Sequence, residues 1–332
     1  MAAPFFSVVI DNYNYGRYLK AAIDSVLAQD FPRKDVELIV VDDGSTDQSR
    51  EIIASYGAKV RGILQPNCGQ ATAFNRGFSE AKGRFVCLLD SDDVWRPEKL
   101  SSIAPLFDDP KVGQVEHFLE DTDVALNPLP QSFPAWPERY VLDDFLKGQT
   151  HWTATSGLCF RKTNLDKALP IPKDLFYYLD DFLSVRVLFD SEAANLPKVL
   201  GAHRVHGGNW CAGGYESPRK LEVDFRMREI FAEHLDRWLA EYQRFLDPAF
   251  TQRQDLEVFR RKVLYQALCA RPVEAWQAWW EGFLRLRGTS FSAFRLASVL
   301  LAVLSPTLYL SAYSSYAQAG RLKDLRLRLF ND

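Results

Sequence analysis

Residues 85–93 read Phe-Val-Cys-Leu-Leu-Asp-Ser-Asp-Asp, so a short apolar run leads directly into three carboxylates. Residues 36–45, Val-Glu-Leu-Ile-Val-Val-Asp-Asp-Gly-Ser, repeat the pattern with two carboxylates before a glycine. Apolar runs of this length are typical of buried strands in a parallel sheet. Because ligands bind such sheets beyond the carboxyl ends of the strands, we expect both acidic clusters at one ligand-binding edge.

Three carboxylates within four residues repel one another unless a cation or a proton neutralises them. The cluster at 90–93 therefore predicts a site for a hard cation, Mn²⁺ or Mg²⁺, whose remaining ligands would be substrate phosphate oxygens. For residues 42–45 alone, ordinary turn and helix-cap chemistry stays open as an alternative. No GxxxxGK[ST] motif is present and no GxGxxG follows the first predicted strand, which favours a nucleotide diphosphate held mainly through metal.

The first hundred residues alternate strand-like and helix-like patterns, which predicts an α/β fold. Beyond about residue 110 the alternation weakens and proline becomes more frequent, and from residue 221 onward the pattern is helical. A further strand is predicted at 199–205. In the first hundred residues, strands are predicted at 5–10, 36–41, 59–64 and 85–89, and helices at 18–27, 46–56 and 69–81.

Composition excludes several classes of protein. With 47% hydrophobic and 25% charged residues among 332, the chain is globular rather than disordered or fibrous. A net charge of −3 gives no concentrated basic excess, so no nucleic-acid partner is expected. Five cysteines without a CxxC pair argue against a disulfide framework and a structural zinc site. The N-terminus has no basic segment before its apolar run, which predicts a first strand instead of a signal peptide, and a cytoplasmic protein.

Five segments, taken in order, resemble the family 2 inverting glycosyltransferases of GT-A fold. The resemblance is dense over the first hundred residues and looser to about residue 210. It implies a Rossmann-like nucleotide-diphospho-sugar transferase domain with a mainly parallel sheet at 1–215, composed of a donor half (1–110) and an acceptor half (111–215). Residues 216–332 would form a helical C-terminal extension. The five segments are 7–14 (SVVIDNYN), 40–47 (VVDDGSTD), 67–70 (NCGQ), 75–77 (NRG) and 89–95 (LDSDDVW).

The resemblance also implies roles for individual residues. The segment after the first strand would lie against the nucleotide base, one member of the acidic pair at 42–43 would accept from a base N–H, and Asp90 would contact the ribose. Asp92 would be the usual metal ligand, with Asp90, Asp93 and His206 as further metal candidates. The donor-binding candidates are Asn12, Tyr13, Asn14, Asp42, Asp43, Asn67, Gly69, Asn75, Arg76, Asp90, Ser91 and Arg204.

Inverting transfer needs a general base that takes the proton of the acceptor hydroxyl. Enzymes of the resembling family use the Asp of a Glu-Asp pair that opens a helix, and Leu179-Asp180-Asp181 occupies that place here. If the trailing Arg186 sets the register, the base is Asp180; if the acidic pair sets it, the base is Asp181. Capping of the helix N-terminus by the pair, without catalysis, is the structural alternative.

The resemblance places an Arg-x-His element at Arg204 and His206, on a loop that can close over the diphosphate. It also implies that residues 152–157 line the acceptor cleft. Within that segment, Trp152, Thr155 and Ser156 are the acceptor-binding candidates.

Together these features predict a metal-dependent inverting glycosyltransferase. It would move a sugar from a nucleotide diphosphate, with UDP favoured, to a hydroxyl of a glycan or lipid-linked glycan, in cell-surface polysaccharide or glycan assembly. A catalytically inactive nucleotide-sugar-binding module and a nucleotidyltransferase are the alternatives, although the latter normally has a basic, glycine-rich N-terminal loop that is absent here. A receiver-type signalling domain fits poorly, because such domains are much shorter.

One stretch is atypical of a soluble chain, since no charge occurs over the 18 residues from Leu296 to Tyr313. This is the lower limit of a membrane span. Its serines argue against a span, and Pro306 should break or kink a helix there. Basic and apolar residues then alternate from Arg321 to Phe330, a composition typical of an interfacial helix on an anionic membrane. Contact with the inner membrane surface and packing on the catalytic domain are the two expectations.

Overall fold

The computed structural model describes residues 3–150, 152–176, 178–209, 217–286 and 293–311. The chain divides into two compact units, one formed by Met1–Ala212 with Phe231–Phe245 and the other by Gly213–Ile230 with Leu246–Asp332. The two halves of helix α8 (Pro218–Glu241) therefore belong to different units.

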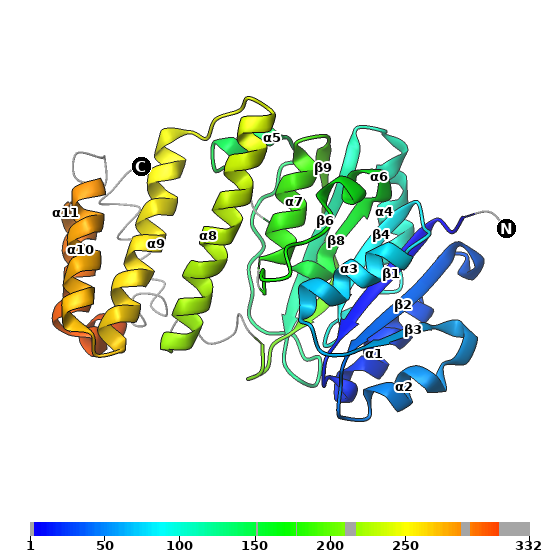
Figure 1. Ribbon diagram of the computed structural model, residues 1–332. Helices are drawn as coiled ribbons and strands as arrows, with labels where there is room; N and C mark the ends of the chain where they lie inside the picture. Colours follow the sequence, from blue (N-terminus) through cyan, green and yellow to red (C-terminus); the bar gives the residue numbers. More distant parts are fainter. Residues whose placement is uncertain (1–2, 151, 177, 210–216, 287–292, 312–332) are drawn as a thin grey trace. The chain divides into compact units, whose positions relative to one another are not determined.

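The first unit is built on one sheet, to which the described residues contribute nine strands (Figure 1). Its strands are β1 (Phe6–Asn12), β2 (Val36–Asp43), β3 (Arg61–Gln65), β4 (Phe85–Asp90), β5 (Val94–Trp95), β6 (Val112–Thr122), β7 (Arg139–Tyr140), β8 (Leu158–Arg161) and β9 (Glu192–Arg204). The order is β3-β2-β1-β4-β8-β6-β9-β5, with β7 paired to β9. β3, β2, β1 and β4 are parallel neighbours, as are β6 and β9, whereas β8, β5 and β7 pair antiparallel.

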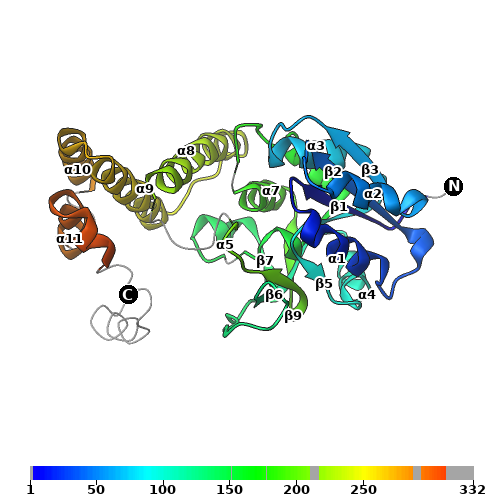
Figure 2. The same ribbon diagram turned by 90° about the horizontal axis from the view of Figure 1, so that it is seen from below.

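Helices cover both faces of this sheet (Figure 2). The predicted α/β fold with its mainly parallel sheet is thereby confirmed. The helices of the first unit besides part of α8 are α1 (Gly16–Leu27), α2 (Ser49–Ser55), α3 (Gln70–Glu80), α4 (Lys99–Ile103), α5 (Leu142–Leu146), α6 (Lys162–Leu165) and α7 (Leu179–Leu188).

Strand β9 is longer than the strand predicted at 199–205. Proline has no N–H to donate to a sheet ladder, so Pro197 is an unfavourable residue inside a strand. In the structure the strand continues through Pro197, and its register against β6 shifts between His117 and Phe118, where the partner changes from Leu196 to Val199. A bulge at this point accommodates the missing donor.

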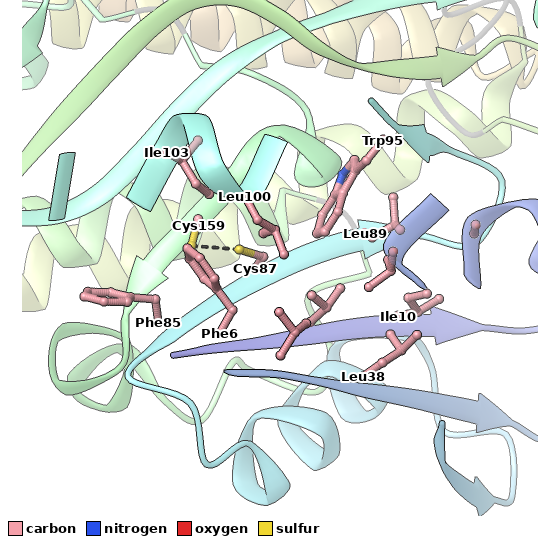
Figure 3. Packing of buried hydrophobic residues seen from close by; sticks show 14 of the residues in the cluster. Phe6, Ile10, Leu38, Phe85, Cys87, Leu89, Trp95, Leu100, Ile103 and Cys159 are labelled. Atoms are coloured by element: carbon pink, nitrogen blue, oxygen red, sulfur yellow. Dashed lines mark hydrogen bonds between the residues drawn. The ribbon is translucent and has the colours of Figure 1, made fainter. Parts of the chain in front are cut away.

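Side chains of β1 alternate between the two faces of the sheet, as strand geometry requires. Phe6, Val8 and Ile10 pack in the same cluster as Leu19 and Ile23 of α1. The cluster continues through Cys87 and Trp95, as Figure 3 shows. The Cys87 thiol lies 2.9 Å from the Cys159 thiol across β4 and β8. Both are free thiols, as are Cys68 and Cys269, which agrees with the absence of a disulfide framework among the residues that the structure describes.

The opposite face of β1 meets helix α3 at Gly77. A Cβ atom on Gly77 would lie 2.3 Å from Val9 Cγ1 and 3.3 Å from Val41 Cγ2, and both valines are fully buried. We therefore expect Gly77→Ala to lower the free energy of unfolding by about 1–3 kcal/mol, although alanine is the better helix former. Urea unfolding followed by circular dichroism measures the change. Gly207→Ala is the control, because a Cβ there meets nothing within 4 Å; equal midpoints for the two variants would contradict the prediction.

The second unit is helical, as predicted. The first half of α8 packs with α9 (Pro248–Leu268), α10 (Pro272–Leu286) and α11 (Ala293–Leu304). Its core includes Leu221, Phe259, Val263 and Val299. Asp224 is buried in this unit and pairs with Arg261 and, at 3.1 Å, with Arg228 Nε.

The predicted helix break near Pro306 is confirmed. Helix α11 ends at Leu304, Ser305 is not helical, and helical geometry resumes at Pro306. Among the residues that the structure describes, no helix is both long and apolar enough to cross a membrane. The basic stretch 321–330 lies outside those residues.

Candidate active site

The sheet register brings the acidic clusters together at one edge. Between β1 and β2, Asn12 is the partner of Asp42, and between β1 and β4, Asp11 is the partner of Asp90. Because all three strands are parallel, their carboxyl ends lie at the same edge. The two acidic motifs, almost fifty residues apart in the chain, thus flank the end of one central strand.

Asn12 and Asp42 tie the ends of β1 and β2 into a single buried network. The Asn12 Nδ2 donates to Asp42 Oδ2 at 3.0 Å and to Ser45 Oγ at 3.1 Å, and Ser45 N–H donates to Asp42 Oδ1 at 3.0 Å. Asn14, in the left-handed region with φ 58°, donates its N–H to the same Ser45 Oγ at 2.9 Å. Tyr13, between the two asparagines, keeps a 45% exposed side chain at this edge.

Asp43 holds the neighbouring loop. Its carboxylate accepts from Gln65 Nε2 at 2.7 Å and from the N–H groups of Cys68 and Gly69 at 2.9 and 2.7 Å. Gly69 has φ +89°, a conformation that favours glycine. A carboxylate has about four acceptor positions, so Asp43 retains one. Asn67 lies exposed in the same loop.

Two of the predicted donor residues, both on α3, make contacts away from the acidic edge. The Asn75 side chain donates to the Ile171 carbonyl and accepts from the Ile171 N–H, each at 2.8 Å. Arg76 pairs with Glu80 at 3.0 Å along the helix surface. Gln70, at the start of the same helix, was not predicted, yet its Nε2 lies 3.4 Å from Asp90 Oδ1.

The cluster contains one more carboxyl group, that of Asp11, than the sequence predicted. Asp11 Oδ1 is buried without a hydrogen-bond partner. Burial, together with the charges of Asp92 and Asp43, raises the pKa of Asp11 to about 7. Burial and the charges of Asp11, Asp93, Asp92 and Asp180 raise the pKa of Asp90 well above its usual value. Sequence reasoning missed Asp11, although an acid at the end of the first strand was a usable signal.

Asp92 meets His206 at the mouth of this cluster. His206 Nε2 lies 2.9 Å from Asp92 Oδ2. Gly208 N–H donates to His206 Nδ1 at 3.0 Å, so Nε2 carries the proton toward Asp92. The imidazole stacks on Tyr18, with ring centroids 5.2 Å apart. Asn209 Nδ2 also approaches Asp92 Oδ2, at 3.4 Å.

This donor set fits a divalent cation. Carboxylate oxygens and an imidazole nitrogen are ligands that Mn²⁺ accepts, and the unpartnered Asp11 oxygen adds negative charge nearby. Within the described ranges, no group of three or more His, Cys, Asp or Glu side chains is arranged to hold a metal. Asp92 and His206 would therefore supply two protein ligands, and a bound diphosphate would supply others. To bind the cation through Nε2, neutral His206 would carry its proton on Nδ1, so its hydrogen bond from the Gly208 N–H would have to open.

Three predicted site residues instead support the loop at 90–93 from behind. Asp93 is fully buried and accepts from Ser156 Oγ at 2.6 Å and from Arg204 N–H at 2.9 Å. Ser156 Oγ also accepts from Asp90 N–H at 3.0 Å. The Arg204 Nε donates to the Asp92 carbonyl at 2.7 Å. The roles with metal for Asp93, with acceptor for Ser156 and with donor for Arg204 stay predictions. Ser91 in this loop is also buried.

Asp180 and Asp181 lie in the first turn of α7. Asp180 Oδ1 accepts from the Asp181 N–H at 3.0 Å, and burial raises the pKa of Asp180. Asp180 is among the charges that raise the pKa of Asp90. Asp181 instead contributes more than Asp180 to raising the pKa of Glu116, a buried residue of β6. The charge of Asp180 thus acts on Asp90, and the charges of both members of the pair act on Glu116.

The predicted acceptor residues surround the neighbouring turn. Trp152 is half-buried, with its ring centroid 6.2 Å from that of Tyr140. Thr155 is nearly buried at the start of a 3-10 turn, Thr155–Gly157. The N–H of Thr153, between them, donates to Glu116 Oε2 at 3.3 Å.

A mainly parallel α/β sheet with a carboxylate edge and a His-Asp pair is the arrangement expected of a GT-A fold. Comparison with known proteins gives the family: residues 7–168 match the model of glycosyl transferase family 2, and this part of the chain belongs to that family.

Similar proteins agree with this assignment. An uncharacterized glycosyltransferase of Nostoc sp. is 38% identical over 212 residues, which cover 61% of this chain and 65% of that protein. The poly(ribitol-phosphate) beta-N-acetylglucosaminyltransferase TarS of Staphylococcus aureus is 27% identical over 71% of this chain and 43% of its own length. The chain thus spans less than two thirds of these relatives.

The fold is also that of a solved structure. The crystal structure of S. aureus TarS 1–349 in complex with UDP-GlcNAc superposes with a TM-score of 0.64 at 22% identity, over 94% of this chain and 91% of that one. At this identity the likeness confirms the GT-A fold.

Proposed function

We propose that the protein is a metal-dependent inverting glycosyltransferase that transfers a sugar from a UDP-sugar to a hydroxyl of a glycan or lipid-linked glycan. The observation that carries this proposal is the carboxylate cluster of Asp11, Asp90 and Asp92, with His206 against Asp92. Such a cluster suits a divalent cation, and the cation suits a diphosphate. The UDP-GlcNAc bound in the solved TarS fragment supports a UDP donor.

On the donor side, three groups would fix the nucleotide. Asp43 would accept from the base N–H, because it is the slightly exposed member of the acidic pair and has an acceptor position left. The exposed ring of Tyr13 would lie against the base, and Asp90 would contact the ribose. Asp92 and His206 would hold the metal, which when bound would neutralise charge on the departing diphosphate.

On the acceptor side, Asp180 would act as the general base. It would take the proton of the acceptor hydroxyl while that oxygen forms a bond to the anomeric carbon and the bond from this carbon to the diphosphate breaks. Attack opposite the departing UDP inverts the anomeric configuration. Burial raises the pKa of Asp180, which makes it a stronger base than an exposed carboxylate.

The cellular setting belongs to the same proposal. The name of TarS describes transfer to a polymer, which supports a role in cell-surface polysaccharide assembly. Peripheral contact with the inner membrane surface rests on the composition of residues 321–330 alone.

Calorimetric titration of UDP into the full chain tests the metal site. We expect binding with Mn²⁺ and at least about tenfold weaker binding with EDTA. Asp92→Asn should weaken the Mn²⁺-dependent binding to a similar extent, because it removes a charged ligand. Asp166→Asn is the matched control, since Asp166 pairs with Lys162 on the surface. Equal UDP affinity with Mn²⁺ and EDTA would contradict metal dependence.

Turnover separates the enzyme from an inactive binding module. Hydrolysis of a panel of UDP-sugars with Mn²⁺, measured as release of UDP, is expected for the enzyme. Tight UDP binding without release from any sugar of the panel would favour the module.

A further inference from the structure

A cavity of about 300 Å³ lies in the acceptor half of the first unit, apart from the carboxylate cluster. Its walls come from the end of β6, from residues 131–136, from residues 152–154 and from His203 of β9. This volume is at the lower end of the range for small-molecule sites, which suits one monosaccharide unit.

Aromatic side chains form much of the cavity wall. Phe118 contacts Phe133 and Trp136, with ring centroids 4.8 and 4.3 Å apart, and Trp152 contributes from the other side. Phe133 is 41% exposed, so part of its surface is available to a ligand. The Trp136 indole Nε1 is buried without a hydrogen-bond partner. A buried N–H in this state favours a ligand that brings an acceptor oxygen.

The polar groups of the cavity wall can form hydrogen bonds with the hydroxyl groups of a ligand. Asp121 Oδ1 lies 2.8 Å from His203 Nδ1, and both side chains keep partial exposure. The Asp121 N–H donates to Gln131 Oε1 at 2.7 Å, and Gln131 Nε2 donates to the Leu119 carbonyl at 3.1 Å. These bonds fasten the segment that carries the aromatic residues onto β6. The cavity is thus lined by a carboxylate, an imidazole and several aromatic rings.

The charge of the residues that line the cavity favours neutral hydroxylated ligands over phosphorylated ones. No lysine or arginine lines the cavity, and its histidine already pairs with a carboxylate. A phosphate group would meet Asp121, and the lining residue His203, which can carry a positive charge, already pairs with that carboxylate, so phosphate binding is disfavoured. Aromatic faces suit the flat apolar face of a sugar ring, whereas a linear polyol phosphate offers no such face.

Two residues of the cavity have neighbours in the candidate active site. His203 precedes Arg204, whose Nε donates to the Asp92 carbonyl. The N–H of Thr153 donates to Glu116 Oε2 at 3.3 Å. The cavity thus shares backbone segments with residues that contact the site.

We propose that this cavity binds a neutral hexopyranose unit of the acceptor. The acceptor would then be a polysaccharide of neutral sugars and not a polyol phosphate chain. The inference rests on the proposed glycosyltransferase function and specifies its acceptor.

The test is a titration of the full chain with small probes, followed by saturation-transfer NMR and tryptophan fluorescence. The probes are methyl β-D-glucopyranoside, methyl β-D-galactopyranoside, methyl α-L-rhamnopyranoside and, as the anionic polyol, ribitol 5-phosphate. Each is titrated with and without UDP and Mn²⁺. We expect saturable binding of at least one glycoside and none of ribitol 5-phosphate.

Two variants locate the binding. Phe133→Ala should raise the dissociation constant of the bound glycoside about tenfold, as truncation of an aromatic anchor does, while UDP affinity stays unchanged. Phe245→Ala, at a residue 84% exposed and outside the cavity, should change neither. Binding of ribitol 5-phosphate in place of the glycosides, binding of no glycoside, or an unaltered constant in Phe133→Ala would overturn the inference. Loss of UDP binding in the wild type would instead count against the proposed function, so the two failures are distinguishable.

Discussion

Asp180→Asn is expected to lower kcat for sugar transfer by about 10²–10⁴-fold, the usual contribution of a general base. The amide keeps the shape and the hydrogen bond from the Asp181 N–H, but it cannot take a proton from the acceptor hydroxyl. Binding of UDP with Mn²⁺ should stay within about twofold of the wild type, since Asp180 is not a proposed metal ligand. Steady-state kinetics and calorimetry on the same preparation measure both quantities.

Asp181→Asn is the matched control, one residue along the same helical turn. We expect it to keep kcat within about tenfold of the wild type, because the proposal assigns the base to Asp180. If Asp181→Asn abolishes transfer and Asp180→Asn does not, the acidic pair and not Arg186 sets the register of the motif, and Asp181 is the base. Retention of full activity in both variants would reject a carboxylate base at α7.

The pH dependence of kcat should report the ionisation of Asp180, the proposed base. Burial raises the pKa of Asp180 above its usual 3.8, and only the ionised form accepts a proton. Transfer should therefore fall as pH decreases through the raised pKa, and the acid limb of kcat should lie above pH 3.8.

Glu116→Gln is expected to change stability strongly, with a sign that depends on pH. Burial, reinforced by the charges of Asp181 and Asp180, raises the pKa of Glu116 from 4.5 to about 8. Between these values the folded state holds a proton that the unfolded state has released. Wild-type stability is therefore lost as pH rises through this interval, by roughly 1.4 kcal/mol per pH unit from this group.

Glutamine removes this loss because it does not titrate. At pH 5 the two proteins should have nearly equal unfolding free energies, and at pH 9 the variant should be more stable by a few kcal/mol. The local hydrogen bonds can be kept. The Thr153 N–H would meet the new amide oxygen. Gln114, whose Nε2 donates to Glu116 Oε1, would turn its amide so that its Oε1, which has no partner, accepts from the new amide N–H. Urea unfolding at both pH values measures the difference. A variant less stable than the wild type at pH 9 would show that Glu116 is ionised and stabilising.

Only part of the site could be predicted from the sequence. Some of its features are patterns of neighbouring residues, whereas others are contacts between residues far apart in the chain. The acids at the ends of β2 and β4 were visible, since strand and cluster are contiguous in the chain. Asp11 was overlooked, because its significance comes from lying opposite Asp90 in the sheet register. The supporting roles of Ser156 and Arg204 depend on hydrogen bonds to residues 63 and 111 positions away, which no local pattern reports.

The sequence by itself determined the alternation of strands and helices, the acidic edge, the family resemblance and the helix break at Pro306. These follow from side-chain periodicity, from the charge of neighbouring residues and from the missing proline N–H, all of which act over a few residues. Tertiary structure alone decided which carboxylates gather at the sheet edge, which accept hydrogen bonds that support the loop, and where aromatic residues from three segments line a cavity. The reason is physical: burial, desolvation and hydrogen-bond satisfaction are properties of groups brought together in space, whatever their separation along the chain.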